Sequence, residues 1–409
     1  MADIKNVFMK KSFLMVVSIC AMLVLTNCAS DDNITELESK LISTTYTLNP
    51  VSDPAIIGDA RMIKNEDASI TIEIKLSGTA PGETYPTDLR VNTAAEGGVT
   101  AISLEGLNGT TGRSTTTFTT LDDGTDITYE DLLEFDGFID VRLNNNAPVT
   151  VLAQGDIGQN ELTGVSKTYT LSTRDIPEIN GNAKFSERKN GEALARIELT
   201  NAIPGTEHPA HIHLNTALDG GTIAFTFNTI DGDTGLSRTN VSALDDGTSF
   251  GYADLIAFDG YVNVHLSPAD LTTIIAQGDI GINGLTGESV VYTLNEVDTP
   301  GIQGTATFFK RESGDALAVL EIENTIAGDS HPAHIHANDI VTTGGILLTF
   351  NPVDGETGMS QTNIIQLNDT TPFGYDDVLQ VNGYINVHES AANIETIIAQ
   401  GNIGVNVDN

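Results

Sequence analysis

Residues 70–76 read Ile-Thr-Ile-Glu-Ile-Lys-Leu, and this stretch decides the fold class. Its apolar side chains occupy every second position, which is typical of a β-strand with one buried face. The same alternation recurs in residues 195–199, and turn-forming dipeptides such as Asp123-Gly124 and Asp246-Gly247 punctuate the chain. We therefore predict an all-β protein built from antiparallel sandwich or barrel domains.

An internal repeat divides the chain into three copies. Tyr-Thr-Leu begins at Tyr46, Tyr169 and Tyr292, so the period is 169 − 46 = 292 − 169 = 123 residues. A period of this length suits a whole domain rather than a solenoid unit. The predicted domains are residues 45–166, 167–289 and 290–409, each long enough to bury its own core.

Short helices are expected between the strands. One per copy is predicted at residues 129–133, 252–256 and 375–379. A further helix is predicted to begin at Ser267-Pro268, because serine is a good N-cap and proline suits the first helical position. The Asp-rich loop of residues 228–235 is interpreted as a hairpin turn, with a calcium site as the alternative.

The first 28 residues resemble a lipoprotein signal peptide. Lys10 and Lys11 precede an apolar run from Phe13 to Leu25, which is too short to span a bilayer but suits a signal-peptide core. Residues 25–28, Leu-Thr-Asn-Cys, resemble a lipobox whose cysteine is lipidated, although asparagine before the cysteine is unusual. We predict lipidation at Cys28 and an outer-membrane anchor, with residues 29–44 as a polar tether; an ordinary cleaved secretory signal is the alternative.

Cysteine content and charge exclude several classes of function. Cys20 and Cys28 are the only cysteines, so the repeats contain neither a disulfide nor a thiolate metal ligand. The formal net charge is 19 − 56 = −37. A chain this acidic, without a basic patch, is not expected to bind nucleic acid. The charge favours solubility at a cell surface.

All eight histidines belong to one constellation that occurs twice. Each copy reads His-Pro-Ala-His-Ile-His, followed by a single histidine 265 − 213 = 388 − 336 = 52 residues later. Imidazole is the commonest transition-metal ligand at neutral pH. The predicted metal ligands are His208, His211, His213 and His265 in the second copy, and His331, His334, His336 and His388 in the third.

Strand periodicity predicts how these side chains converge. In a strand, His211 and His213 lie on one face and Ile212 on the other. His265 similarly lies opposite Val264. If the aliphatic side chains fill the core, three histidines per copy meet off the core on neighbouring strands. His208 and His331, in the preceding loops, are expected to add a fourth ligand or to control access.

The first copy serves as an internal control. It carries Tyr85, Asp88, Arg90 and Arg142 where the second copy has its four histidines. The fold therefore does not need the histidines, and they vary as a set, as ligands should. The alternative is that the histidines only hydrogen-bond loops together, and that an ion-pair cluster of Asp88, Arg90 and Arg142 replaces them in the first copy.

At these residues the chain resembles the CHRD domain, first named in chordin. The resemblance rests on Ala-His-Ile-His, on Tyr-Val/Ile-Asn-Val-His and on the closing Ala-Gln-Gly-Asp/Asn-Ile-Gly. It covers all three copies, although the first lacks the histidines. The closing segment departs from the family's usual Gly-Glu-Ile-Arg-Gly-Gln-like ending. The resemblance implies a β-rich extracellular domain, often repeated, and does not supply a settled activity.

Three classes of function compete. The first is a cell-envelope lipoprotein whose second and third domains bind copper or zinc through their histidines, since imidazole-only sites favour these ions. The second is a structural or adhesive surface repeat without metal. The third is a copper-dependent redox enzyme with chemistry similar to superoxide dismutase, although four histidines per domain are too few for a two-metal site. We predict the metal-binding module, with no enzymatic residues assigned.

Overall fold

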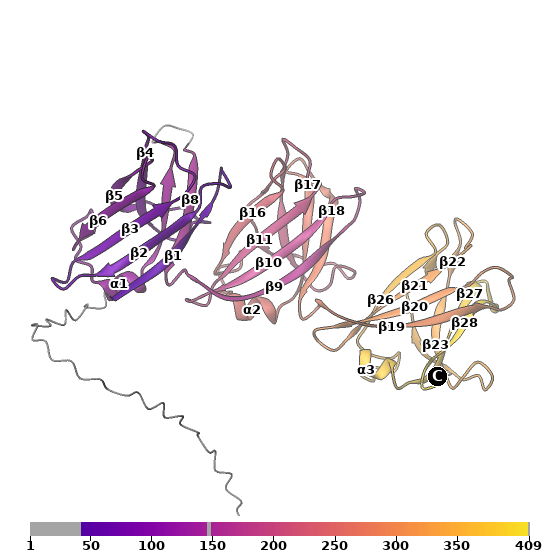
Figure 1. Ribbon diagram of the computed structural model, residues 1–409. Coiled ribbons are helices and arrows are strands. Elements are labelled where there is room, and N and C mark those ends of the chain that lie inside the picture. The colour runs from indigo at the N-terminus through magenta and orange to yellow at the C-terminus, as the bar shows by residue number, and fades with distance from the viewer. Residues whose placement is uncertain (1–41, 145–148, 408–409) are drawn as a thin grey trace, which may run out of the picture. The chain divides into compact units, whose positions relative to one another are not determined.

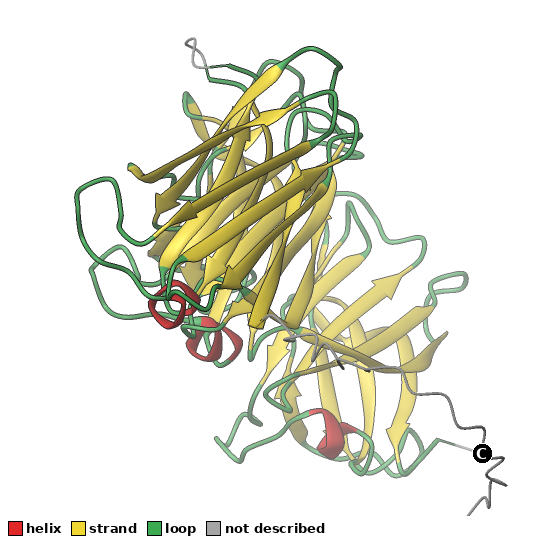
Figure 2. Cartoon of the chain, turned by 60° about the vertical axis from the view of Figure 1, so that its left-hand side comes forward, coloured by secondary structure: helices red, strands yellow, loops and turns green. Residues whose placement is uncertain are grey.

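A computed structural model describes residues 42–144 and 149–407. The predicted signal peptide, Cys28 and most of the tether lie outside the described residues. Antiparallel strands make up most of the described chain, as Figure 2 shows in yellow. The prediction of an all-β fold with three β domains is confirmed. Among the described residues, no helix has the length and hydrophobicity needed to cross a bilayer.

The first domain is a closed barrel in the strand order β1-β2-β3-β6-β5-β4-β7-β8 (Figure 1). Strand β1 closes it by pairing with β2 and, through Asn49 and Pro50, with β8. The strands are β1 (Ile42–Pro50), β2 (Gly58–Lys64), β3 (Ile70–Leu76), β4 (Thr84–Val91), β5 (Thr100–Asn108), β6 (Arg113–Phe118), β7 (Asp136–Arg142) and β8 (Val151–Gly158).

The second domain is a curled ten-stranded sheet in the order β12-β15-β16-β11-β10-β9-β18-β17-β13-β14. The counterpart of β4 is divided here into β12 and β13, on either side of Pro209, and the counterpart of β5 is divided into β14 and β15. Strand β12 pairs with β15 and β13 pairs with β14, so the sheet has two edges. Its strands are β9 (Leu162–Thr173), β10 (Asn180–Arg188), β11 (Ala193–Thr200), β12 (Glu207–His208), β13 (Ala210–Leu214), β14 (Ile223–Thr226), β15 (Ile230–Asp231), β16 (Leu236–Val241), β17 (Asp259–Ser267) and β18 (Asp270–Gly281).

The third domain repeats this sheet in the corresponding order, β22-β25-β26-β21-β20-β19-β28-β27-β23-β24. Its strands are β19 (Leu285–Glu296), β20 (Gly304–Arg311), β21 (Ala316–Ile322), β22 (Ser330–His331), β23 (Ala333–Ala337), β24 (Ile346–Thr349), β25 (Val353–Asp354), β26 (Met359–Ile364), β27 (Asn382–Ser390) and β28 (Asn393–Gly404).

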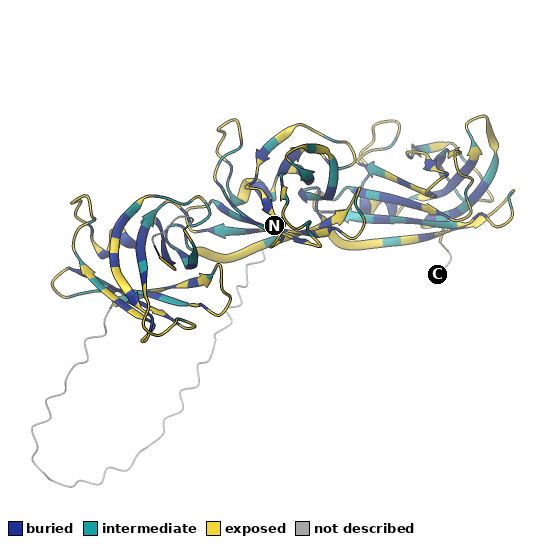
Figure 3. Ribbon diagram, turned by 90° about the horizontal axis from the view of Figure 1, so that it is seen from above, coloured by how far each residue is buried: buried dark blue, intermediate teal, exposed yellow. Residues whose placement is uncertain are grey.

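Each domain has a separate hydrophobic core. Buried and exposed residues alternate along many strands (Figure 3). Ile70, Ile72 and Ile74 are at most 1 % exposed, which confirms the buried face predicted for residues 70–76. In the second domain the core includes Ile212, Val262 and Val264, each 0 % exposed. The histidines of β13 and β17 therefore lie on the opposite face from the core, as predicted.

One helix per copy forms where the sequence predicts it. The helices are α1 (Tyr129–Leu133), α2 (Tyr252–Ile256) and α3 (Tyr375–Val378). The helix predicted at Ser267-Pro268 is wrong. Ser267 instead pairs with Asp270 across a two-residue turn that joins β17 to β18. The loop at residues 228–235 contains a turn in which the Asp231 carboxylate accepts hydrogen bonds from the backbone of Asp233 and Thr234.

Candidate metal centre

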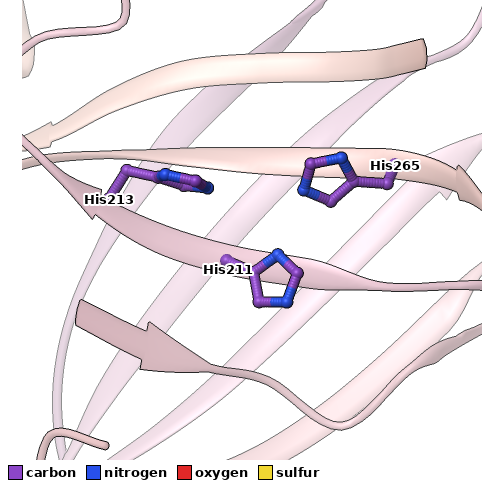
Figure 4. A group of neighbouring side chains, drawn as sticks. All are labelled: His211, His213 and His265. Atoms are coloured by element: carbon purple, nitrogen blue, oxygen red, sulfur yellow. The ribbon is translucent and has the colours of Figure 1, made fainter. Parts of the chain in front are cut away.

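Strand pairing brings three histidines of the second domain together. His211 and His213 lie on β13, opposite Asn263 and Tyr261 of β17, and His265 follows two residues after Asn263. One ring nitrogen from each of His211, His213 and His265 lies within 4.8 Å of the others. The ring centroids are 5.0–6.4 Å apart. Figure 4 shows the three rings around a common space.

The third domain builds the same group. His334, His336 and His388 bring their ring nitrogens within the same 4.8 Å, with ring centroids 5.2–6.4 Å apart. A tetrahedral ion with metal–nitrogen bonds of about 2.0–2.1 Å needs nitrogens roughly 3.4 Å apart. Side-chain rotations that move each nitrogen by about 1 Å or less would bring the groups to this separation.

A backbone carbonyl selects the nitrogen that His213 presents. Its Nδ1 lies 3.0 Å from the carbonyl oxygen of Gly221, and only an Nδ1–H tautomer can donate this bond. The Nε2 lone pair therefore remains available to an ion, an arrangement typical of metal-binding histidines. His336 and Gly344 repeat the bond at 3.0 Å. Gly221 must be glycine, because a Cβ there would lie 2.0 Å from the Leu214 carbonyl oxygen.

Tyrosine rings fix the same imidazoles from one side. Tyr261 stacks on His213 with centroids 5.0 Å apart and planes inclined by 20°. Tyr384 stacks on His336 at 5.1 Å and 20°. A ring held by a carbonyl and a stacked tyrosine has little rotational freedom, so these two histidines are preorganised as ligands.

Burial keeps the histidines in the form that binds metal. His211, His213 and His265 are at most 9 % exposed. Burial lowers the pKa of His211 to about 4, and the neighbouring rings of His265 and His213 add to the lowering. Burial, with His388 and His336, lowers the pKa of His334 to about 4 as well. Burial also lowers the pKa of His265 and His388. At neutral pH the imidazoles of His211, His265, His334 and His388 are therefore uncharged, as ligation requires.

Several ring nitrogens are buried without a hydrogen-bond partner of normal geometry. In the described part of the second domain they include Nδ1 of His211, Nε2 of His213 and both ring nitrogens of His265. The same four atoms recur in His334, His336 and His388. Buried polar atoms in native proteins almost always have a partner. A bound cation would satisfy one nitrogen of each ring.

The structure does not bring His208 or His331 into these groups. His208 is fully buried and has both ring nitrogens engaged, because Nδ1 bonds the Leu266 carbonyl at 2.7 Å and Nε2 accepts from the Ile203 amide at 3.3 Å. His331 makes the equivalent Nδ1 bond to the Glu389 carbonyl at 2.7 Å. His208 thus links β12 to β17 and His331 links β22 to β27, which is the hydrogen-bonding role that the sequence left open as an alternative. The Nε2 of His331, unlike that of His208, is buried without a hydrogen-bond partner.

In the first domain a charge cluster occupies the equivalent position. Asp88 pairs with Arg90 at 2.9 Å and with Arg142, and Asp140 pairs with Arg90 at 2.9 Å and with Arg142 at 3.5 Å. The predicted ion-pair cluster is therefore present, with Asp140 as a fourth member. Burial raises the pKa of Asp140, and the two arginines oppose this. Two carboxylates and two guanidinium groups neutralise one another, and the described residues of this domain contain no group that could hold a metal ion.

Comparison with known proteins adds no relative. No family model matches the chain, and no curated protein or solved structure matches it significantly. The functional argument therefore depends on the geometry of the site.

Proposed function

We propose that the chain is a cell-envelope lipoprotein whose second and third domains each bind one copper or zinc ion. The observation that carries this proposal is the convergence of three ring nitrogens within 4.8 Å, twice in one chain. The tautomer set by Gly221 and the lowered histidine pKa values support the same reading.

The donor set limits the choice of ion. Three imidazoles without a thiolate suit zinc or copper, and intrinsic affinity favours Cu(II) over Zn(II). Three protein ligands also leave a coordination position for water or a small ligand. With copper bound, such an open position would permit redox chemistry, whereas zinc is redox-inactive. A turnover assay on the copper-loaded protein separates a binding module from an enzyme. The adhesive-repeat alternative requires that no ion binds.

Metal content tests this function. The mature protein, with all three domains, is loaded with Zn(II) or Cu(II) and desalted. It should retain about two ions per chain, because each histidine triad can hold one ion. His213→Ala should retain about one ion, and His213→Ala combined with His336→Ala should retain close to none. Elemental analysis gives the count.

His208→Gln is the matched control for this count. It removes an imidazole of the same domain that lies outside the triad, so the variant should keep two ions if circular dichroism shows that it folds. If His213→Ala retained two ions, or if folded His208→Gln lost one, the proposed assignment of the ligands would be wrong. A wild-type count near zero would favour the adhesive repeat.

Anchoring at Cys28 is proposed from the sequence alone. The Lys10-Lys11 pair, the 13-residue apolar run and the lipobox-like residues 25–28 support an exported, lipidated protein. In a bacterial host, radiolabelled palmitate should enter the wild-type chain, and Cys28→Ala should abolish the label. Equal labelling of both proteins would contradict the anchor. The resemblance to CHRD repeats likewise remains a proposal, supported by the motifs of the second and third copies.

A further inference from the structure

The two histidine triads are alike, but the charges around them differ. Position 245 in the second domain is aspartate, and the equivalent position 245 + 123 = 368 is asparagine. Position 270 is also aspartate, and the equivalent position 270 + 123 = 393 is asparagine. The second domain therefore carries two carboxylates where the third carries two neutral amides.

Asp245 is fixed beside His211 through one threonine. Thr226 of β14 lies directly opposite His211 of β13. The Asp245 carboxylate accepts from the Thr226 amide at 3.0 Å and from its hydroxyl at 2.7 Å. In the third domain Thr349 lies opposite His334, and Asn368 bonds its amide at 3.1 Å and its hydroxyl at 3.0 Å. Asp245 and Asn368 thus occupy equivalent positions, but only Asp245 carries a negative charge.

Asp270 lies at the start of β18 and pairs with Ser267, two residues after His265. Its carboxylate accepts four hydrogen bonds, from the amides and hydroxyls of Thr272 and Thr273, at 2.8–3.1 Å. This network holds the negative charge in place close to the end of β17, which carries His265. The side chain of Asn393 instead donates to the Glu389 carboxylate. Its backbone amide donates to the Ser390 hydroxyl, as the backbone amide of Asp270 does to that of Ser267.

We propose that the second-domain triad binds a divalent cation more tightly than the third-domain triad, and that Asp245 and Asp270 cause the difference. This inference rests on the proposed metal-binding function. Neither carboxylate belongs to the group of ring nitrogens that can hold the ion, so both act through space. Two such charges near a partly buried divalent ion are expected to change its affinity by roughly tenfold at low salt, and less at high salt. The two sites would then fill in sequence as the metal concentration rises.

The experiment uses full-length protein with one site removed at a time. His388→Ala leaves the second-domain site, and His265→Ala leaves the third-domain site. Zn(II) affinity is measured at pH 7.5 by competition with a chromophoric chelator. The chain with the second-domain site should bind roughly tenfold more tightly, and the ratio should shrink in 0.5 M salt because the ions screen the carboxylates.

Exchanging the side chains between domains supplies the decisive control. Asp245→Asn with Asp270→Asn should weaken the second-domain site to the level of the third. Asn368→Asp with Asn393→Asp should strengthen the third-domain site to the level of the second. Each exchange introduces a residue that the other copy already accommodates, so the fold should persist. Equal affinities in the two starting chains, or exchanges without effect, would overturn the inference. Absence of zinc binding in both starting chains would instead overturn the metal-binding function itself.

Discussion

Asp88→Ala should destabilise the first domain by about 3–5 kcal/mol, the usual cost of removing one partner from a buried ion pair. Asp88 pairs with both Arg90 and Arg142, and it is 8 % exposed. Its removal leaves the buried Arg142 and the half-buried Arg90 with Asp140 as the remaining carboxylate of the cluster. An arginine cannot remove its own positive charge by losing a proton, because its pKa is too high.

Urea titration followed by hydrogen-exchange mass spectrometry measures this effect, because peptides report on each domain separately. The matched control is His211→Ala, at the equivalent position of the second domain, in protein freed of metal. Removing one neutral imidazole from a metal-free triad should cost about 1 kcal/mol or less, since it leaves no unpaired charge. Equal losses of unfolding free energy in the two domains would contradict this account, in which Asp88 belongs to a charge cluster and His211 to a set of metal ligands.

Mild acid should destabilise the metal-free second and third domains by roughly 2 kcal/mol each between pH 7 and pH 5. The pKa of His211 is about 4 in the folded domain and near 6.5 in the unfolded chain. The unfolded chain therefore binds more protons between these values. Stability is complete above about pH 6.5 and falls as the pH drops toward 4. His334 has the same lowered pKa and predicts the same loss in the third domain.

The first domain is the internal control for the acid effect, because it contains no histidine. The same exchange measurement at pH 7 and pH 5 should show little change in its free energy of unfolding. Uniform acid destabilisation of all three domains would show that carboxylates, and not the buried imidazoles, control stability in this range.

Most of the fold could be predicted from sequence periodicity, because alternating apolar residues mark the strands directly. The error at Ser267-Pro268 shows the limit of local signals. Proline's fixed φ suits the first position of a helix and also the second position of a β-turn. Pairing of β17 with β18 decides between them, and that pairing is a long-range property of the sheet.

The candidate site was predictable where it follows from strand geometry. The spacing of His211 and His213, with His265 on another strand, was sufficient to predict three converging imidazoles. His208 lies beside a proline at a break between strands, where periodicity gives no orientation, so its bonds to Leu266 and Ile203 could not be foreseen. The Gly221 carbonyl was also missed, since a backbone acceptor carries no residue-type signal beyond the local glycines.

X-ray absorption at the zinc edge, on full-length protein loaded with two equivalents of Zn(II), tests the central claim most directly. The account predicts an average first shell of three imidazole nitrogens at about 2.0–2.1 Å, with the outer-shell scattering of imidazole rings and one further light ligand. When His213 and His336 are both replaced by alanine, the spectrum should become that of hydrated zinc. A wild-type shell composed of oxygens, or one with fewer than two imidazoles, would contradict the assignment of the triads as metal sites.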